Sequence, residues 1–263
     1  MSALAASCSM PRMCRARTNW YEPSRSTRLG ARQRRAILRS GLAAVGLWWG
    51  AAAMAQDAPA PIDASDRSAF AAPEEGGLRR WIVATEAPSE IRADAGPVHK
   101  IVGVVERGVV LANFGCSRLA SGMWCEVARL TGGQRGFVPA DDLAPIAGPD
   151  GVVAVGVDDS PRRARRGDFD AADDIACAQE VGETMGTCRA EVARSSGGDA
   201  TLIANFANGF RRVLHFQHGL FLRGNATMSG VGTDTDWHLD GGVYHVRVDD
   251  QRFEVPAGLI VGR

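Results

Sequence analysis

Two short apolar runs that each carry a cysteine constrain this 263-residue chain more than any other feature. The first run ends at Gly115-Cys116, and the second is Trp124-Cys125-Glu126-Val127, with a polar turn between them. A glycine, an aromatic residue and a valine follow as Gly136-Phe137-Val138. β-Type runs on either side of a turn predict a hairpin, and a cysteine in each run predicts a disulfide across it. The stretch therefore predicts a small antiparallel barrel and does not specify a ligand.

The first 55 residues have the composition of an export signal. Of the 30 basic and 30 acidic residues in the chain, nine arginines and one acid (Glu22) lie there, which leaves 21 against 29 and a formal charge of −8 in the remainder. Residues 40–55 are uncharged and end in the small residues Ala53 and Ala55. We therefore expect a signal peptide that is cleaved before Gln56, so that no membrane insertion persists.

Two questions about this leader stay open. A membrane anchor is the alternative to cleavage, although residues 40–55 fall short of the roughly 20 apolar residues that a spanning helix needs. Arg34-Arg35 is compatible with twin-arginine export as well as with the general route. Either route leads to a periplasmic or secreted protein.

The cysteine spacing agrees with an oxidising compartment. Cys8 and Cys14 lie in the leader, and the other four cysteines form two pairs that are close in sequence, Cys116 with Cys125 and Cys177 with Cys188. Four cysteines permit three pairings. The spacing favours the two local disulfides, which persist outside the cytosol.

Strand-forming runs fill residues 79–145, after a stretch at 56–78 that is rich in Ala, Pro and Asp and that we interpret as a flexible linker. Short β-branched and aromatic runs begin at Trp81 and Ile91 and continue over Ile101–Val105 and Val109–Phe114. Gly, Pro or charged residues separate them. About five short strands without a helical period predict a small barrel that closes its own edges.

Residues 79–145 resemble the bacterial SH3 domains. The residues that carry the resemblance are Ile91-Arg92-Ala93, Trp124-Cys125-Glu126-Val127 and Gly136-Phe137-Val138. The resemblance implies an SH3-like barrel that binds cell-wall peptide. Most barrel aromatics are expected in the core, with one or two lining a groove at its mouth. The candidate binding residues are Trp81, Arg92, Trp124 and Phe137.

The remaining residues divide into a linker and a second domain. Residues 146–168 contain four arginines, at 162, 163, 165 and 166, whose charge is offset by flanking aspartates, and we expect a solvated linker there. Residues 169–263 alternate apolar and polar side chains, with turn sequences such as Asn208-Gly209, His218-Gly219 and Gly241-Gly242. This pattern predicts six or seven antiparallel strands with one buried face, preceded by a short helix or loop over residues 173–185. The predicted fold class is all-β.

The sequence argues against catalytic, metal and nucleic-acid sites. Predicted disulfides leave no free thiolate for a cysteine nucleophile, and the chain lacks Gly-x-Ser-x-Gly and His-Glu-x-x-His patterns. His215 lies on the opposite strand face from Leu214, and His218 lies in a turn, so these two imidazoles do not converge. A pair of His215 and His245 on adjacent strands is the one metal arrangement to examine. Export and the acidic remainder disfavour nucleic acid.

We therefore expect an exported, non-catalytic binding module without a cofactor, which docks on cell-wall peptide through its SH3-like domain. The first alternative is a periplasmic protein-interaction or scaffold role. A cell-wall hydrolase is the second alternative, because active sites that arise by convergence need no sequence motif.

Overall fold

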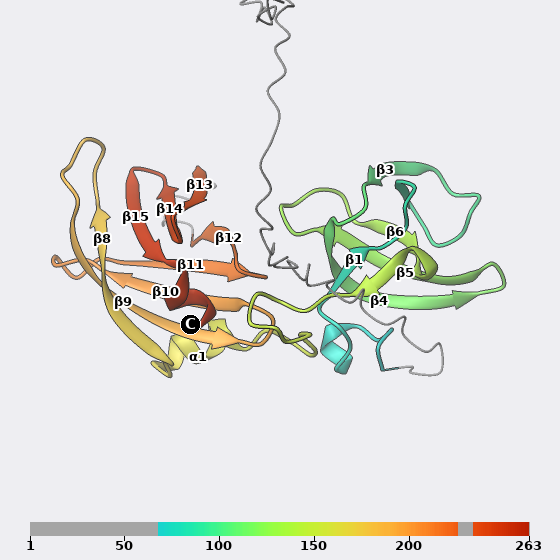
Figure 1. Ribbon diagram of the computed structural model, residues 1–263, viewed down its shortest axis with the longest axis horizontal. Coiled ribbons are helices and arrows are strands. Elements are labelled where there is room, and N and C mark those ends of the chain that lie inside the picture. The colour runs from blue at the N-terminus through green and yellow to red at the C-terminus, as the bar shows by residue number, and fades with distance from the viewer. Residues whose placement is uncertain (1–67, 226–233, 263) are drawn as a thin grey trace, which may run out of the picture. The chain divides into compact units, whose positions relative to one another are not determined.

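The computed structural model describes residues 68–225 and 234–262, which form two antiparallel β-sheets. Figure 1 shows the first sheet in teal and green and the second from yellow to red. Both sheets belong to one compact unit. The all-β fold class is thus confirmed, whereas the predicted signal peptide and the first half of the predicted linker at 56–78 lie outside the described residues. No helix in the described ranges is long and apolar enough to cross a membrane.

The first sheet contains seven strands in the order β3-β2-β6-β5-β4-β1-β7. Their bounds are β1 (Arg80–Val83), β2 (Ser89–Arg92), β3 (Ile101–Val105), β4 (Val110–Leu119), β5 (Gly122–Arg129), β6 (Gly136–Pro139) and β7 (Leu143–Pro145), with a short 3-10 helix η2 (Ala140–Asp142) before β7. The strands expected from the β-branched runs are therefore present. The sheet has more strands than expected because the short segments after the hairpin, β6 and β7, also pair.

One face of the first sheet forms its core. Trp81, Leu111, Val127 and Val138 are each at most 1% exposed, and they come from four different strands. Their alternation with more exposed neighbours, as in the pattern of β6, follows from the two-residue period of a strand. The opposite face remains available for polar and exposed aromatic side chains.

The second sheet contains eight strands in the order β12-β11-β10-β9-β8-β15-β14-β13. Their bounds are β8 (Ala171–Ala178), β9 (Gly186–Ser195), β10 (Asp199–Asn205), β11 (Arg211–Gln217), β12 (Leu220–Gly224), β13 (Thr235–Asp240), β14 (Val243–Val248) and β15 (Gln251–Pro256), and α2 (Ala257–Val261) follows. Apart from the β8–β15 pair, hydrogen-bonded neighbours in this order are consecutive in the chain. Because the edge strands β12 and β13 also contact each other, this up-and-down sheet is nearly closed into a barrel.

The hairpin turns of the second sheet lie where the sequence predicted them. His218 and Gly219 have φ angles of 53° and 70°, and Gly241 and Gly242 have φ angles of 53° and 81°. Positive φ at both central residues is the signature of a two-residue turn whose twist matches the flanking strands. These turns set the register that places alternate side chains of β11 and β14 in the core and Trp237 of β13 against it.

The expectation of a helix or loop over residues 173–185 is wrong for its first half. Residues 173–178 belong to β8, which pairs with both β9 and β15. Ala and Asp are weak strand formers, but Ile175 and Cys177 alternate into the core, and pairing on both sides overrides the local preference. The β8–β9 loop occupies the remainder of the expected segment.

The described half of the predicted flexible linker at 56–78 is packed against the first sheet. Phe70 stacks on Trp81 with a centroid separation of 5.8 Å, and the Asn113 side-chain amide donates to the carbonyl oxygens of Ala71 and Leu78. A 3-10 helix, η1 (Pro73–Glu75), lies within it. The composition did not reveal this order, because a single aromatic residue and backbone hydrogen bonds to a distant side chain produce no periodic pattern.

The segment expected to be a solvated linker at 146–168 also contains order, since α1 (Ser160–Arg166) lies within it. Ala164 on this helix packs with Ala193 and Ile203 of the second sheet. Arg163 forms ion pairs with Asp168 at 2.9 Å and Asp170 at 2.8 Å, so charge compensation by flanking aspartates is observed for this arginine. The helix covers part of the second sheet's outer face.

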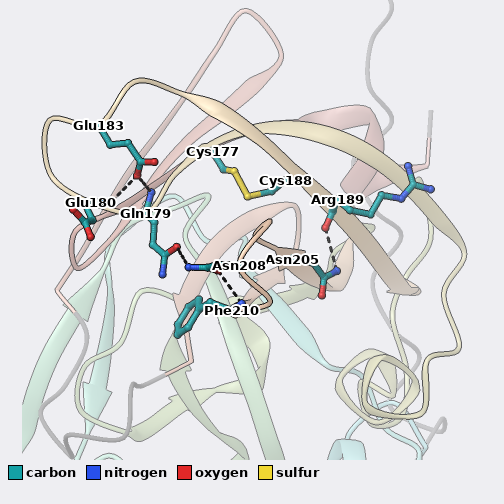
Figure 2. Close-up of a disulfide and its surroundings, with 9 residues drawn as sticks. All are labelled: Cys177, Gln179, Glu180, Glu183, Cys188, Arg189, Asn205, Asn208 and Phe210. Atoms are coloured by element: carbon teal, nitrogen blue, oxygen red, sulfur yellow. Dashed lines mark hydrogen bonds between the residues drawn. A yellow bond between two sulfur atoms is a disulfide. The ribbon is translucent and has the colours of Figure 1, made fainter.

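Both predicted disulfides are present. Cys116 and Cys125 are direct partners across the β4–β5 hairpin, and Cys177 and Cys188 link β8 to β9 (Figure 2). Beside the second disulfide, the Glu183 carboxylate accepts hydrogen bonds from the backbone N–H groups of Gln179 and Glu180 at 2.6 and 3.0 Å. The disulfide and these hydrogen bonds hold the β8–β9 loop.

A buried ion cluster joins the start of β1 to the β9–β10 turn. Asp199 is 1% exposed and forms ion pairs with Arg79 and Arg80, which are 9% and 4% exposed. Arg79 also donates to the carbonyl oxygens of Gly156, Val157 and Ser196. Arg79 and Arg80, at the start of the first sheet, therefore pair with Asp199 of the second sheet.

Candidate functional site

The outer face of the first sheet carries a row of charged and aromatic side chains across its central strands. Phe137 on β6 is the direct partner of Arg92 on β2 and of Glu126 on β5. Direct partners in an antiparallel sheet point to the same face, and all three are partly exposed. Phe114 and Arg135 lie beside Glu126, and we call these five residues the aromatic–arginine strip.

An irregularity in β4 presents Phe114 to solvent. The β4–β5 register shifts between Asn113 and Cys116, so that Phe114 and Gly115 have no partner in the β4–β5 register. Gly115 has a φ of 103°, and a Cβ atom there would lie 3.3 Å from the Cβ atom of Ala72. A glycine with positive φ is a usual component of such a bulge. As a result, Phe114 is 37% exposed instead of buried.

The charges of the strip are held in place by their neighbours. The Arg135 guanidinium lies 3.7 Å from the ring centroid of Phe114 and forms an ion pair with Glu126 at 2.9 Å. Arg92 donates to the carbonyl oxygen of His99 at 2.7 Å and pairs with the carboxylate of Glu90. These contacts limit side-chain motion before a ligand arrives, which reduces the entropy cost of binding.

The four candidate binding residues fall into two groups. Arg92 and Phe137 are adjacent and partly exposed on the strip. Trp81 and Trp124 are 1% and 5% exposed, so their side chains offer almost no surface to a ligand. Trp81 belongs to the core cluster, whereas Trp124 alternates with the core residues Cys125 and Val127 along β5. The structure thus brings together two of the four and buries the other two.

Sequence reasoning did not include Phe114, Glu126 or Arg135 among the candidate binding residues. The pair Phe114-Gly115 could have indicated the exposure of Phe114, because a glycine inside a strand pattern often marks a bulge. The position of Arg135 has no comparable signal. It depends on the loop before β6, whose path the sequence does not reveal.

The histidines of the second sheet are arranged differently from the pair singled out in the sequence. His215 lies on β11, which is not hydrogen-bonded to β14, the strand of His245. The direct partner of His245 is His238 on β13, and the two rings stack with centroids 4.7 Å apart. Over residues 68–225 and 234–262, no group of three or more His, Cys, Asp or Glu residues is placed to hold a metal ion.

His215 occupies a polar, partly buried position beneath α1. Its Nδ1 lies 3.4 Å from the hydroxyl of Thr201, which in turn lies 3.0 Å from the hydroxyl of Ser160. Burial, and to a smaller extent the nearby cations Arg223 and Arg165, lower the pKa of His215 to about 4. The neutral imidazole is therefore the form that the folded protein accommodates.

This histidine predicts a loss of stability in mild acid. A depressed histidine pKa means that the unfolded chain binds the proton more tightly, so the stability is complete above pH 6.5 and falls as the pH drops toward about 4. Because solvent reaches part of the His215 side chain, we expect the free energy of unfolding to fall by only about 1–3 kcal/mol over this pH range. Urea unfolding of the wild type and of His215→Gln at pH 7 and pH 4.5 measures it.

His215→Gln should show a smaller difference between the two pH values, because glutamine does not titrate. Arg223→Gln removes one of the two cations and should also reduce the acid loss. An equal acid loss in wild type and His215→Gln would contradict the assignment to this residue.

Comparison with known proteins gives no relative for this chain: no family model, curated protein or solved structure matches it. The resemblance of residues 79–145 to bacterial SH3 domains therefore stays a prediction.

Proposed function

We propose that this protein is an exported, non-catalytic binding module and that the aromatic–arginine strip of its first sheet docks on cell-wall peptide. The observation that supports the proposal is the adjacency of Arg92, Phe137 and Glu126 on one exposed face, with Phe114 and Arg135 beside them. Aromatic residues and arginine are the side chains that most often dominate binding energy at protein surfaces.

The charge pattern of the strip suits a peptide that carries both carboxylates and amines. Arg92 supplies a planar donor for a carboxylate, and Glu126 supplies an acceptor for an ammonium group. The phenyl rings add apolar contact between these charges. Cell-wall peptide combines the same features, and the resemblance to bacterial SH3 domains points to the same ligand.

The periplasm is the location that we propose for this activity. The two disulfides support an oxidising compartment. The arginine-rich leader with its small residues at Ala53 and Ala55 supports cleavage after export.

A periplasmic protein partner is the second candidate, and the edge strand β3 favours it. Ile101 and Val104 on this strand are 44% and 47% exposed, and β3 lies at one end of the sheet order. An exposed apolar edge strand is a template for the addition of a strand from another protein. In this alternative, the strip and the edge together form a protein-interaction surface.

Sedimentation with purified cell-wall sacculi tests the proposal. The double variant Phe114→Ala/Phe137→Ala should reduce pelleting at least about tenfold, because loss of central aromatic contacts typically costs more than about 1.4 kcal/mol. Val181→Ala is the matched control, since this apolar side chain is 78% exposed in the β8–β9 loop of the other sheet. The control should pellet like the wild type.

Two outcomes would contradict the proposal. Absence of wild-type pelleting at low salt would remove the cell-wall ligand and favour the protein partner. Release of soluble muropeptides in the same assay would identify a hydrolase.

A further inference from the structure

A pocket of about 220 Å³ lies on the second sheet, over strands β13, β14 and β15. The residues that line it include Met185, His238, His245, Arg247, Arg252 and Glu254. None of them belongs to the aromatic–arginine strip. The pocket is smaller than a typical site for a drug-sized ligand, so only a small molecule or the end of a chain fits it.

The strand register arranges the pocket in two rows. Asp236, Arg247 and Arg252 are direct partners across β13, β14 and β15, and His238, His245 and Glu254 form the next row. In β14 and β15 these residues alternate with Tyr244, Val246, Phe253 and Val255, which belong to the core. The two-residue period of these strands therefore presents two rows of charged and imidazole side chains on the outer face.

The two arginines of the pocket differ in how their charge is balanced. Arg247 forms an ion pair with Asp234 at 2.9 Å. In the described ranges Arg252 forms no ion pair, and its guanidinium donates to the carbonyl oxygen of Glu183. Its Nε atom is buried without a hydrogen-bond partner among the described residues. Arg252 thus carries a positive charge that no carboxylate of the described residues contacts directly, and one N–H donor without a partner.

Glu254 supplies a negative charge two residues further along the same strand. Its carboxylate is 44% exposed, and the imidazole Nδ1 of His245 lies 3.7 Å from it. The stacked rings of His238 and His245, inclined by 12° to each other, form a flat wall beside it. A cation-binding and an anion-binding group therefore lie on the same face of β15.

The β8–β9 loop closes one side of the pocket and is rigidly held. It contributes Met185 to the lining and the Glu183 carbonyl oxygen to Arg252. Figure 2 shows the Glu183 carboxylate hydrogen-bonded to the backbone of Gln179 and Glu180, next to the Cys177–Cys188 disulfide. The pocket wall is thus formed before a ligand binds, which favours affinity.

We propose that this pocket binds a zwitterionic dipeptide unit, with its carboxylate on Arg252 and its ammonium group on Glu254. Residues two apart on a strand are separated by roughly 6.8 Å, and two extended residues of a ligand span about 7 Å. A dipeptide parallel to β15 therefore places one terminus on each charge. The site is independent of the proposed function of the first sheet.

Isothermal titration of the full chain with alanyl-alanine tests this assignment. N-acetyl-alanyl-alanine lacks the ammonium group and alanyl-alanine amide lacks the carboxylate, so each should bind at least about tenfold more weakly. Arg252→Gln and Glu254→Gln should each cause a similar loss toward alanyl-alanine, and Arg252→Lys should retain part of the affinity because it keeps the charge. Arg189→Gln, which removes an exposed arginine on β9, is the matched control and should bind like the wild type.

Equal binding of all three dipeptides, or unchanged binding by both glutamine variants, would overturn the assignment. Absence of heat with alanyl-alanine at millimolar concentration would also overturn it. The variant Phe114→Ala/Phe137→Ala should bind alanyl-alanine normally even where it fails to pellet with sacculi. The outcome of this titration is thus separate from that of the sedimentation assay.

Discussion

Replacing Asp199 with alanine is expected to lower the free energy of unfolding by about 3–5 kcal/mol, because the change leaves two buried arginines without an anion. Arg79 and Arg80 are 9% and 4% exposed, so water does not solvate either guanidinium well. The Asp199 carboxylate also accepts a hydrogen bond from the backbone N–H of His218 at 2.9 Å, which is lost as well. Chemical denaturation at pH 7 measures the change.

An exposed ion pair in the same protein provides the control for Asp199→Ala. Asp174 is 64% exposed and lies 3.4 Å from Arg189, so Asp174→Ala should change the stability by less than about 1 kcal/mol. Asp199→Asn should be nearly as damaging as Asp199→Ala, because an amide keeps the shape but not the charge. A stability loss at Asp199 no greater than at Asp174 would show that the two arginines find other partners.

Replacing Trp81 with alanine is the second change with a large expected effect, a loss of about 3–5 kcal/mol. The side chain is 1% exposed and stacks on Phe70, so alanine leaves a cavity where the packed segment meets the sheet. Thermal unfolding followed by far-ultraviolet circular dichroism measures the loss of stability.

Trp81→Phe separates the packing of Trp81 from its polar atom. The indole Nε1 is buried without a hydrogen-bond partner among the described residues. Phenylalanine lacks this unsatisfied donor and keeps much of the side-chain volume of tryptophan. We expect Trp81→Phe to be clearly more stable than Trp81→Ala. Equal losses for the two variants would mean that the ring fills no tightly packed site.

The burial of Trp81 also changes how a binding experiment should be designed. An alanine at either Trp81 or Trp124 removes a buried side chain, so reduced binding by such a variant would report unfolding as readily as a lost contact. Phe114 and Phe137 avoid this difficulty, because both are partly exposed.

The all-β class, strands β1 to β5 of the first sheet and both disulfides follow from local patterns in the sequence. Alternation of apolar residues and turn pairs such as His218-Gly219 act over a few residues and need no knowledge of the fold. Cys116 and Cys125 are close in sequence on either side of a turn, so their pairing is also a local property.

The packed segments that composition alone assigned to linkers could not be predicted in the same way. Phe70 and Ala164 each make their contact with residues of a sheet, Trp81 in one case and Ile203 in the other. β8 becomes a strand because β9 and β15 offer hydrogen bonds on both sides, although Ala and Asp favour other structures. In each case a distant partner decides the outcome.

In the candidate sites, too, local sequence identifies single residues, whereas distant pairings bring them together. Arg92 and Phe137 were found as separate residues, but their adjacency depends on the pairing of β2 with β6, which lie far apart in the sequence. The dipeptide pocket depends on three strands and on a loop from β8. No spacing rule within the chain joins Arg252 to Glu183, which lie 69 residues apart.

The local character of the two disulfides has a consequence for how the protein is made. Among the four described cysteines, each native bond joins a cysteine to the next one along the chain, with separations of 9 and 11 residues. As the polypeptide emerges from its amino-terminal end, Cys125 therefore meets its correct partner before Cys177 appears. Among these four cysteines, oxidation in order of emergence would give the native pairing without reshuffling of wrongly joined thiols, which takes seconds to hours.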